Sequence, residues 1–261
     1  MSNDYLEKLL QSKKYRGVCP DTIRRVWAEC DARYKKPRDV DQAAREALHG
    51  ITGAFLTSAE VSHCAWAMQN WLAGGKTDSQ LENILNKHAS TRERLPLSSM
   101  DALYGRIFEI TGRPGRVLDL ACGINPIYLG ARDLRTVGVD ISGDAVSLVN
   151  AFGETYVAPV RAVCADVLCD GAIPGEWFDV ALMFKVLPLL ERQKTGAAAR
   201  VMSAVNAAYL VASFPTRTLG GRNVGMAAHY GDWMDAHVPA GRTVAGRFET
   251  ENELFYILGR T

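Results

Sequence analysis

A chain of 261 residues with 48% hydrophobic residues, 23% charged residues and a net charge of +1 has the composition of an ordinary globular protein with a substantial core. None of its apolar runs approaches the ~20 residues that a membrane-spanning helix needs, and the N-terminus lacks the apolar segment of a signal peptide. These properties argue against a membrane or secreted protein and predict a cytoplasmic one.

The first part of the chain, residues 1–113, is predicted to be a helical N-terminal region. Asp21 stands in N-cap position before a helical stretch at 22–27. Apolar residues then recur at helical spacing in four further stretches, at 40–49, 58–72, 79–88 and 100–110.

This N-terminal region carries a local excess of basic residues that the net charge hides. Between Lys13 and Arg38 there are nine basic residues and three acidic ones. Such a segment is typical of a solvated helix face, but it also suits phosphate binding, because a polyanion responds to local rather than global charge. The candidates for phosphate contact in this segment are Lys13, Lys14, Arg16, Arg24 and Arg25.

The six cysteines are scattered, without a Cys-x-x-Cys pair or a matching His-x-x-x-His pair. This pattern predicts no metal site. In a reducing compartment we expect these residues to be buried as small hydrophobic side chains. They are Cys19, Cys30, Cys64, Cys122, Cys164 and Cys169.

After Gly115 the pattern changes to short β-branched runs that alternate with helical stretches. Seven strands are predicted, at 116–121, 136–139, 160–166, 177–184, 209–214, 243–248 and 254–258. Helices between the early strands indicate an α/β domain with a mostly parallel, doubly wound sheet over residues 114–261. The last two strands lack a helix of normal length between them, so we expect them to form an antiparallel pair.

The first of these strands ends in a turn of small residues, DLACGINP at 119–126. Ligands of open α/β sheets bind at the carboxyl ends of the strands, where Ala121 and Gly123 allow the backbone to approach closely. A dinucleotide site would favour G-x-G-x-x-G, whereas here Pro126 removes an amide donor and Asp119 brings negative charge. The turn therefore disfavours NAD and favours a cationic ligand such as a sulfonium.

Two further acids end the next two predicted strands. Asp140 can accept hydrogen bonds from both hydroxyls of a ribose, and Asp166 can accept one from the amino group of an adenine. Any one of these acids could be a helix cap or a surface residue, but three acids at the ends of successive strands indicate an adenosyl ligand. Together with Asp119 they predict S-adenosylmethionine as the cofactor of a methyltransferase.

Beyond this turn, the chain resembles the aminoglycoside-resistance 16S rRNA (guanine-N7) methyltransferases of the Arm/Rmt group over nearly its whole length. The motifs that carry the resemblance are SKKYR (12–16), CPDT (19–22), LHG (48–50), GAF (53–55), HASTRER (88–94), DLACGINP (119–126), DVL (166–168), FKVLPLLE (184–191) and SFPTRTLGGR (213–222). Together these motifs are far more specific than the cofactor turn alone.

The resemblance implies a Rossmann-like class I methyltransferase with an α-helical N-terminal extension that docks on rRNA. It implies methylation of N7 of guanosine 1405 in the 16S rRNA of the assembled 30S subunit, and hence aminoglycoside resistance. By motif position, the residues that would line the cofactor site are Phe55, His88, Ala89, Ser90, Arg94, Ala121, Gly123, Asp140, Asp166, Val167, Phe184 and Gln193. Arg94 could pair bidentately with the methionine carboxylate, and Phe55 stands where some relatives have tyrosine.

Methylation of guanine N7 requires little acid–base chemistry, because N7 has a free lone pair and loses no proton. Catalysis should therefore depend on positioning and electrostatics. The base must be flipped into the pocket, where an aromatic ring or a guanidinium can stack on it. The candidates to hold it are Phe184, Lys185, Phe214 and Arg217, with core packing as the alternative for Phe214; Arg222 lies in the same glycine-rich loop as Arg217 and is a further candidate for RNA contact.

Two other functions stay open on the residues alone. One is a methyltransferase that acts on a small molecule or a protein, which would leave the basic segment from Lys13 to Arg38 without a purpose. The other is a non-catalytic RNA-binding module, which should not bind S-adenosylmethionine. For docking on a large ribosomal particle, we expect a monomer.

Overall fold

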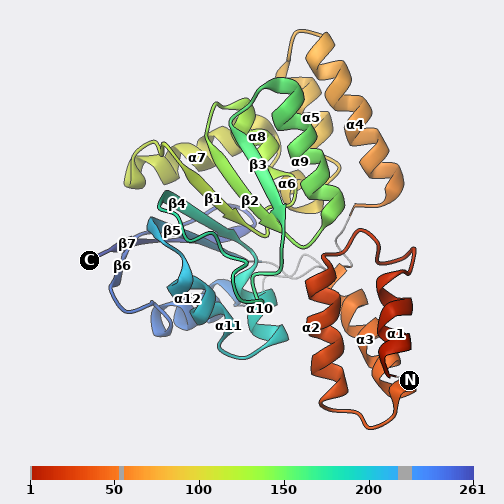
Figure 1. Ribbon diagram of the computed structural model, residues 1–261. Coiled ribbons are helices and arrows are strands. Elements are labelled where there is room, and N and C mark those ends of the chain that lie inside the picture. Colours follow the sequence, from red (N-terminus) through yellow and green to blue (C-terminus); the bar gives the residue numbers. More distant parts are fainter. Residues whose placement is uncertain (1, 53–55, 217–224) are drawn as a thin grey trace.

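The computed structural model describes residues 2–52, 56–216 and 225–261. Its sheet has seven strands in the order β3-β2-β1-β4-β5-β7-β6, in which β1 to β5 run parallel and β7 runs antiparallel to both of its neighbours (Figure 1). The strands are β1 (Val117–Leu120), β2 (Thr136–Asp140), β3 (Val160–Cys164), β4 (Phe178–Phe184), β5 (Ala207–Pro215), β6 (Arg242–Glu249) and β7 (Glu253–Arg260). The predicted mostly parallel sheet and the antiparallel final pair are both confirmed.

Helices cover both faces of this sheet, and each face has its own buried core. One core lies under α7 (Leu97–Thr111), α8 (Asn125–Ala131) and α9 (Gly143–Tyr156), with α4 (Ser58–Ala73) and α5 (Asp78–Leu85) packed outside them. The other core lies under α10 (Leu187–Gln193), α11 (Ala197–Ala204) and α12 (Met226–Ala236). Strands buried on both sides explain why their sequences read as nearly continuous apolar runs.

The first three helices form a separate bundle at one side of the molecule (Figure 1). They are α1 (Ser2–Leu10), α2 (Pro20–Asp31) and α3 (Pro37–Thr52), and they enclose a third core that includes Tyr15, Ile23 and Leu48. The bundle with its own core therefore ends before α4, earlier than the predicted domain boundary at residue 113. The reason is that α4, α5 and α7 share their core with the sheet. Helical spacing could not indicate this, since it shows that a helix has an apolar face but not which partner covers it.

The start of α2 differs from its prediction. Asp21 is not the N-cap: the cap is Cys19, and the helix begins at Pro20. The reason is that the fixed φ of a proline suits the first turn of a helix, where its missing N–H is not needed. Asp21 lies inside that turn and pairs with Arg24 at 3.0 Å.

The bundle is joined to the sheet beside the end of β2. The amide of Cys19 donates to the carbonyl of Ile141 at 2.7 Å, and the amide of Gly143 donates to the carbonyl of Gly17 at 2.7 Å. A short antiparallel bridge between Val18 and Ser142 lies between these bonds. The bundle is thus held against the loop that immediately follows Asp140. In the described ranges, no helix is both long enough and apolar enough to span a membrane.

Candidate functional site

The turn after β1 has a backbone that few residues other than glycine adopt. Ala121 and Gly123 both have left-handed φ values, of 56° and 49°. A Cβ on Gly123 would lie 2.6 Å from Cε1 of His88, which is far inside van der Waals contact. Glycine is therefore favoured at position 123 both by its backbone conformation and by the close approach of the His88 ring.

Asp140 closes this turn from the neighbouring strand. Its Oδ2 accepts a hydrogen bond from the amide of Gly123 at 2.7 Å, and its Oδ1 accepts one from the amide of Ser142 at 2.8 Å. A carboxylate offers about four lone-pair positions, so Asp140 can accept further hydrogen bonds beside those from the backbone amides. The side chain is only half-buried. This geometry suits a carboxylate that accepts from the two hydroxyls of a ribose.

Asp119 lies deeper, on β1 itself, with a relative exposure of 2%. The amide nitrogen of Asn125 donates to it at 2.7 Å and also to the hydroxyl of Tyr104 at 2.8 Å. Burial raises the pKa of Asp119 to about 7. A group that gains its charge near neutrality is suited to pairing with a cation that enters the site.

The raised pKa of Asp119 predicts a pH-dependent stability. Asp119 binds its proton more tightly in the folded state than in the unfolded state, where its pKa is about 3.9. Its contribution is therefore fully present below about pH 4 and is lost as the pH rises to about 7, with an upper limit of roughly 4 kcal/mol. We expect Asp119→Asn, which cannot ionise, to gain stability relative to the wild type between pH 5 and pH 8 in urea unfolding. A stability difference that does not change with pH would contradict this assignment.

His88, Ala89 and Ser90 lie over the same turn. Nδ1 of His88 and Oγ of Ser90 are 2.8 Å apart, and the imidazole packs on Gly123. Burial lowers the pKa of His88, although the nearby Asp140 opposes this shift. A neutral imidazole can both donate and accept a hydrogen bond, so the ring suits a structural contact or a contact with a polar ligand. All three residues are partly buried.

Arg94 has protein partners that the sequence pattern did not suggest. Its guanidinium is paired bidentately with Glu253, at 2.8 Å from Nε to Oε1 and 3.0 Å from Nη2 to Oε2. Nη1 donates to the carbonyl of Ser90 at 3.1 Å. Three of the five guanidinium donors are therefore engaged by the protein, and the pairing with a ligand carboxylate stays a prediction. Burial alone would raise the pKa of Glu253, but Arg94 outweighs it and holds that pKa below its usual range.

Asp166 and Gln193 also have a partner that the sequence pattern did not suggest. Both accept hydrogen bonds from Arg25, at 2.9 Å and 2.8 Å. Arg25 was predicted to contact RNA phosphates, but its side chain is only 12% exposed and is directed into the protein. The prediction for Arg25 is therefore wrong, because its donors face the end of β3 and α10 instead of solvent. Val167, next to Asp166, is buried.

Phe184 and Lys185 end β4, the strand next to β1. Phe184 packs edge-on against Phe255 and lies under the guanidinium of Arg94. Lys185 has a left-handed φ of 56°, which is costly for a residue other than glycine and is often found at functional sites. Its amide donates to the carbonyl of Ser213 on β5, and its Nζ pairs with Glu93 and lies 3.6 Å from Glu253. Lys185 is thus held in one orientation at the edge of the site.

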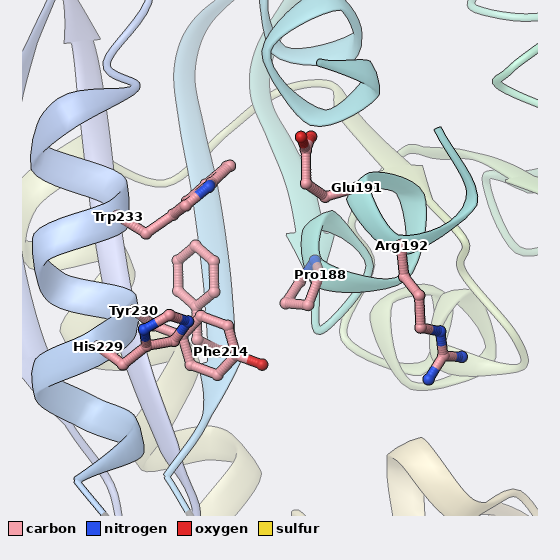
Figure 2. A pocket seen from close by; sticks show the side chains of 7 residues that line it. All are labelled: Pro188, Glu191, Arg192, Phe214, His229, Tyr230 and Trp233. Carbon is pink, nitrogen blue, oxygen red and sulfur yellow. The ribbon is translucent and has the colours of Figure 1, made fainter. Parts of the chain in front are cut away.

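The structure favours core packing for Phe214, the alternative that its position in β5 left open. Its relative exposure is 0%, and Tyr230 of α12 covers its ring at 5.1 Å between centroids. Phe214 does line the floor of a pocket of about 280 Å³ between α10 and α12 (Figure 2). The aromatic residues that are partly exposed there are Tyr230 and Trp233. A base could not stack on Phe214 while Tyr230 occupies its face.

Three of the predicted residues, Phe55, Arg217 and Arg222, lie outside the described residues. Of the predicted phosphate contacts, the structure exposes Lys13, Lys14, Arg16 and Arg24 on the N-terminal bundle. Apart from Phe214, the remaining predicted residues lie around three centres: Gly123 with Asp140, Glu253, and Arg25. Within the part of the chain that the structure describes, no three His, Cys, Asp or Glu side chains gather as a metal-binding group.

Two acidic residues of the site were not predicted. Glu253 joins Arg94, Lys185 and Ser213, and Glu93 pairs with Lys185. In the sequence, Glu253 could have been noticed only as a carboxylate that directly precedes the apolar run at 254–258. Glu93 lies within the HASTRER motif, where its position alone did not separate it from a surface residue.

Comparison with known proteins gives matches over almost the whole chain. A family model described as "Ribosomal RNA methyltransferase (FmrO)" matches residues 11–257. A 16S rRNA (guanine(1405)-N(7))-methyltransferase of Serratia marcescens is 40% identical over 257 residues, which cover 98% of this chain and 97% of that protein. The crystal structure of the 16S rRNA methyltransferase RmtF in complex with S-adenosyl-L-homocysteine superposes with a TM-score of 0.89 at 43% identity, covering 100% of this chain and 98% of that one. The 16S rRNA methylase RmtB superposes with a TM-score of 0.86 at 36% identity, covering 100% and 99%.

Proposed function

The chain belongs to the ribosomal RNA methyltransferase (FmrO) family, and on that premise we propose that it methylates N7 of guanosine 1405 in 16S rRNA and thereby confers aminoglycoside resistance. The observation that carries the proposal is the 40% identity over 98% of the chain to a relative named for this reaction. The fold is that of a class I methyltransferase, and the solved structure of RmtF contains S-adenosyl-L-homocysteine.

The residues at the carboxyl ends of β1, β2 and β3 fit S-adenosylmethionine. Asp140 would accept from the ribose hydroxyls, and Asp166 would accept from the amino group of the adenine. Asp119 would pair with the ammonium group of the methionine. When bound, the cofactor supplies an electrophilic methyl group on a positively charged sulfur.

The residues at the end of β4 would receive the base. Phe184 is largely buried under the guanidinium of Arg94, so it would shape the floor of the base site, and Lys185 offers a donor that Glu93 and Glu253 hold in place. Neither residue needs to remove a proton, since N7 attacks through a lone pair. Their role is to hold N7 in line with the methyl group, and such positioning can account for about 7–11 kcal/mol of a barrier. Phe214 has no part in this, because its ring is covered.

The N-terminal bundle is proposed to dock on the rRNA of the assembled 30S subunit. It presents four exposed basic residues, Lys13, Lys14, Arg16 and Arg24, and it is attached directly to the loop after Asp140. A monomer that acts in the cytoplasm suits this substrate. After methylation, N7 carries a positive charge, which would repel a polycationic aminoglycoside from that groove.

Reversing three of the basic charges is expected to weaken binding to the subunit. The triple variant Lys13→Glu, Lys14→Glu, Arg16→Glu should lower the slope of log K against log salt by up to about 2–3, because each lost phosphate contact removes about 0.7–0.9 from it. Filter binding to 30S subunits at several salt concentrations measures this slope. Arg113→Glu with Arg135→Glu, which reverses two charges away from the bundle, is the control, since both residues are exposed and stand before the amino ends of strands. If the triple variant folds and its slope is unchanged, these residues do not contact phosphates and form only a solvated face.

Mapping of rRNA modification tests the function itself. Purified protein and S-adenosylmethionine are incubated with 30S subunits, and the rRNA is then mapped by cleavage at N7-methylguanosine followed by primer extension. We expect one new stop, at guanosine 1405, and higher aminoglycoside resistance in cells that express the protein. Intact subunits that remain unmodified at this nucleotide would refute the proposal and favour a methyltransferase with another acceptor. The failure of S-adenosylmethionine to bind in calorimetry would instead favour a non-catalytic RNA-binding module.

A further inference from the structure

A largely buried ion pair connects the N-terminal bundle to the loop after β3. Nε of Arg25 on α2 donates to Oδ2 of Asp166 at 2.9 Å, and Nη2 donates to Oε1 of Gln193 at 2.8 Å. The side chains of Arg25 and Asp166 are 12% and 4% exposed, so salt in the solvent screens this pair little. One arginine of the bundle therefore holds an acid and an amide of the catalytic domain.

The orientation of the Asp166 carboxylate depends on this arginine. Its Oδ1 accepts from the amide of Leu168 at 2.9 Å, and its Oδ2 accepts from Arg25. A buried carboxylate that loses its hydrogen-bonded cation is left with an unsatisfied oxygen, and its side chain tends to turn toward another donor. Arg25 and the amide of Leu168 thus fix the orientation of the Asp166 carboxylate as an acceptor, which an adenine amino group requires.

The same bundle also holds the loop that carries the other acid. Backbone hydrogen bonds join Gly17 and Cys19 to Ile141 and Gly143, directly after Asp140. A Cβ on Gly17 would lie 2.8 Å from Oδ2 of Asp144, so the two segments are closely packed here. The bundle therefore contacts the loops of both acids that would hold the adenosine of the cofactor.

We propose that Arg25 is a positioning residue that couples rRNA docking on α1–α3 to the binding of the cofactor, through Asp166. The inference rests on the proposed function and adds to it a link between the two substrates. Because coupling between two binding sites is reciprocal, a cofactor that fixes Asp166 also favours the docked position of α2.

The neighbouring arginine supplies a matched control. Arg24 lies on the same helix, but its side chain is 56% exposed and pairs with Asp21 within the first turn. Removing Arg24 deletes one positive charge from α2 without touching the hydrogen bonds of Asp166. Any effect that is specific to Arg25 is therefore separated from the general loss of a basic charge.

Calorimetry of the isolated full-length protein with S-adenosylhomocysteine tests the first half of the proposal. We expect Arg25→Ala to raise the Kd about 10- to 100-fold, because a buried hydrogen bond to a charged group is lost. Arg25→Lys should recover part of this loss, since an ammonium can reach the carboxylate but cannot fork to Gln193 as well. Arg24→Ala should leave the Kd within about twofold of the wild type and weaken 30S binding instead, as expected for a phosphate contact.

Binding to 30S subunits with and without S-adenosylhomocysteine tests the second half. The wild type should bind the subunit at least about fivefold more tightly with the ligand present, and Arg25→Ala should lose this difference. Wild-type Kd values in Arg25→Ala, or an unchanged ligand effect on 30S binding, would overturn the coupling. If Arg25→Ala does not fold by circular dichroism, Arg25→Met, which keeps the length of the side chain but not its charge, decides, and a wild-type Kd in that variant overturns the proposal.

These outcomes remain distinct from a failure of the proposed function. A wild-type protein that binds S-adenosylhomocysteine but leaves guanosine 1405 unmodified refutes the methylation site, while the comparison of Arg25 with Arg24 still tests the positioning role. A wild-type protein that does not bind S-adenosylhomocysteine overturns both.

Discussion

Replacing Asp140 with alanine is expected to raise the Kd for S-adenosylhomocysteine by about 10²- to 10⁴-fold and to abolish detectable methylation. The variant would lose two hydrogen bonds from ribose hydroxyls to a charged carboxylate, each worth about 1.5–3 kcal/mol. It would also lose the bonds that Asp140 accepts from the amides of Gly123 and Ser142, which hold the turn closed. Calorimetry gives the Kd, and the rRNA modification map gives the activity.

Two comparisons make this result specific to the carboxylate. Asp140→Asn keeps the shape of the side chain and one oxygen, so its Kd should lie between those of the wild type and Asp140→Ala. Asp170→Ala removes an exposed acid of the same domain and should leave the Kd unchanged. If Asp140→Ala is folded and binds S-adenosylhomocysteine as tightly as the wild type, the ribose contact is assigned to the wrong residue.

Replacing Arg94 with methionine should have the largest effect on stability. Arg94 and Glu253 are 7% and 2% exposed, and Arg94 supplies two of the hydrogen bonds that Glu253 accepts. Removing one partner of a buried pair leaves an uncompensated charge and costs about 3–5 kcal/mol. At about 2–4 °C per kcal/mol, the Tm should fall by roughly 6–20 °C in calorimetric unfolding. Because Lys185 lies 3.6 Å from Glu253 and still compensates part of its charge, we expect a fall in the lower half of this range.

The double variant Arg94→Met, Glu253→Met checks the cause. If the unpaired carboxylate accounts for the loss, removing it as well should restore much of the stability, because apolar replacements of a buried pair are often neutral or better. If the double variant is instead less stable than Arg94→Met by the full cost of a second core substitution, packing and not charge accounts for the loss of stability. Arg106→Met is a suitable control, since its guanidinium is exposed and lies over Phe248.

Much of the fold was predictable because it depends on local patterns. Each of the seven strands was expected within a few residues of its observed bounds. The inner strands such as β1 and β4 are buried on both faces and are apolar almost throughout, whereas the partly exposed β3 and β6 were indicated by their β-branched residues and the turns beside them. The antiparallel final pair followed from the short connection between β6 and β7. The turn around Gly123 was predictable for a similar reason, because its constraint is a backbone conformation that only a few residue types can adopt.

The acids at the strand ends were predictable as a set, but their immediate partners were not. Parallel strands bring their carboxyl ends to one edge, so Asp119, Asp140 and Asp166 had to lie along that edge. Arg25, however, is 141 residues from Asp166, and Arg94 is 159 residues from Glu253. Nothing in the spacing of these residues favours one pairing over another.

The sequence by itself therefore determined the fold class, the cofactor turn and the family, because these depend on periodicity, backbone constraints and motifs that are contiguous in the chain. Only the tertiary structure decided which arginines face solvent and which neutralise a buried acid. The physical reason is that a buried charge must find an opposite charge wherever packing places one. Arg24 and Arg25 are adjacent in sequence and equal in charge, and the packing of α2 against the end of β3 alone separates their roles.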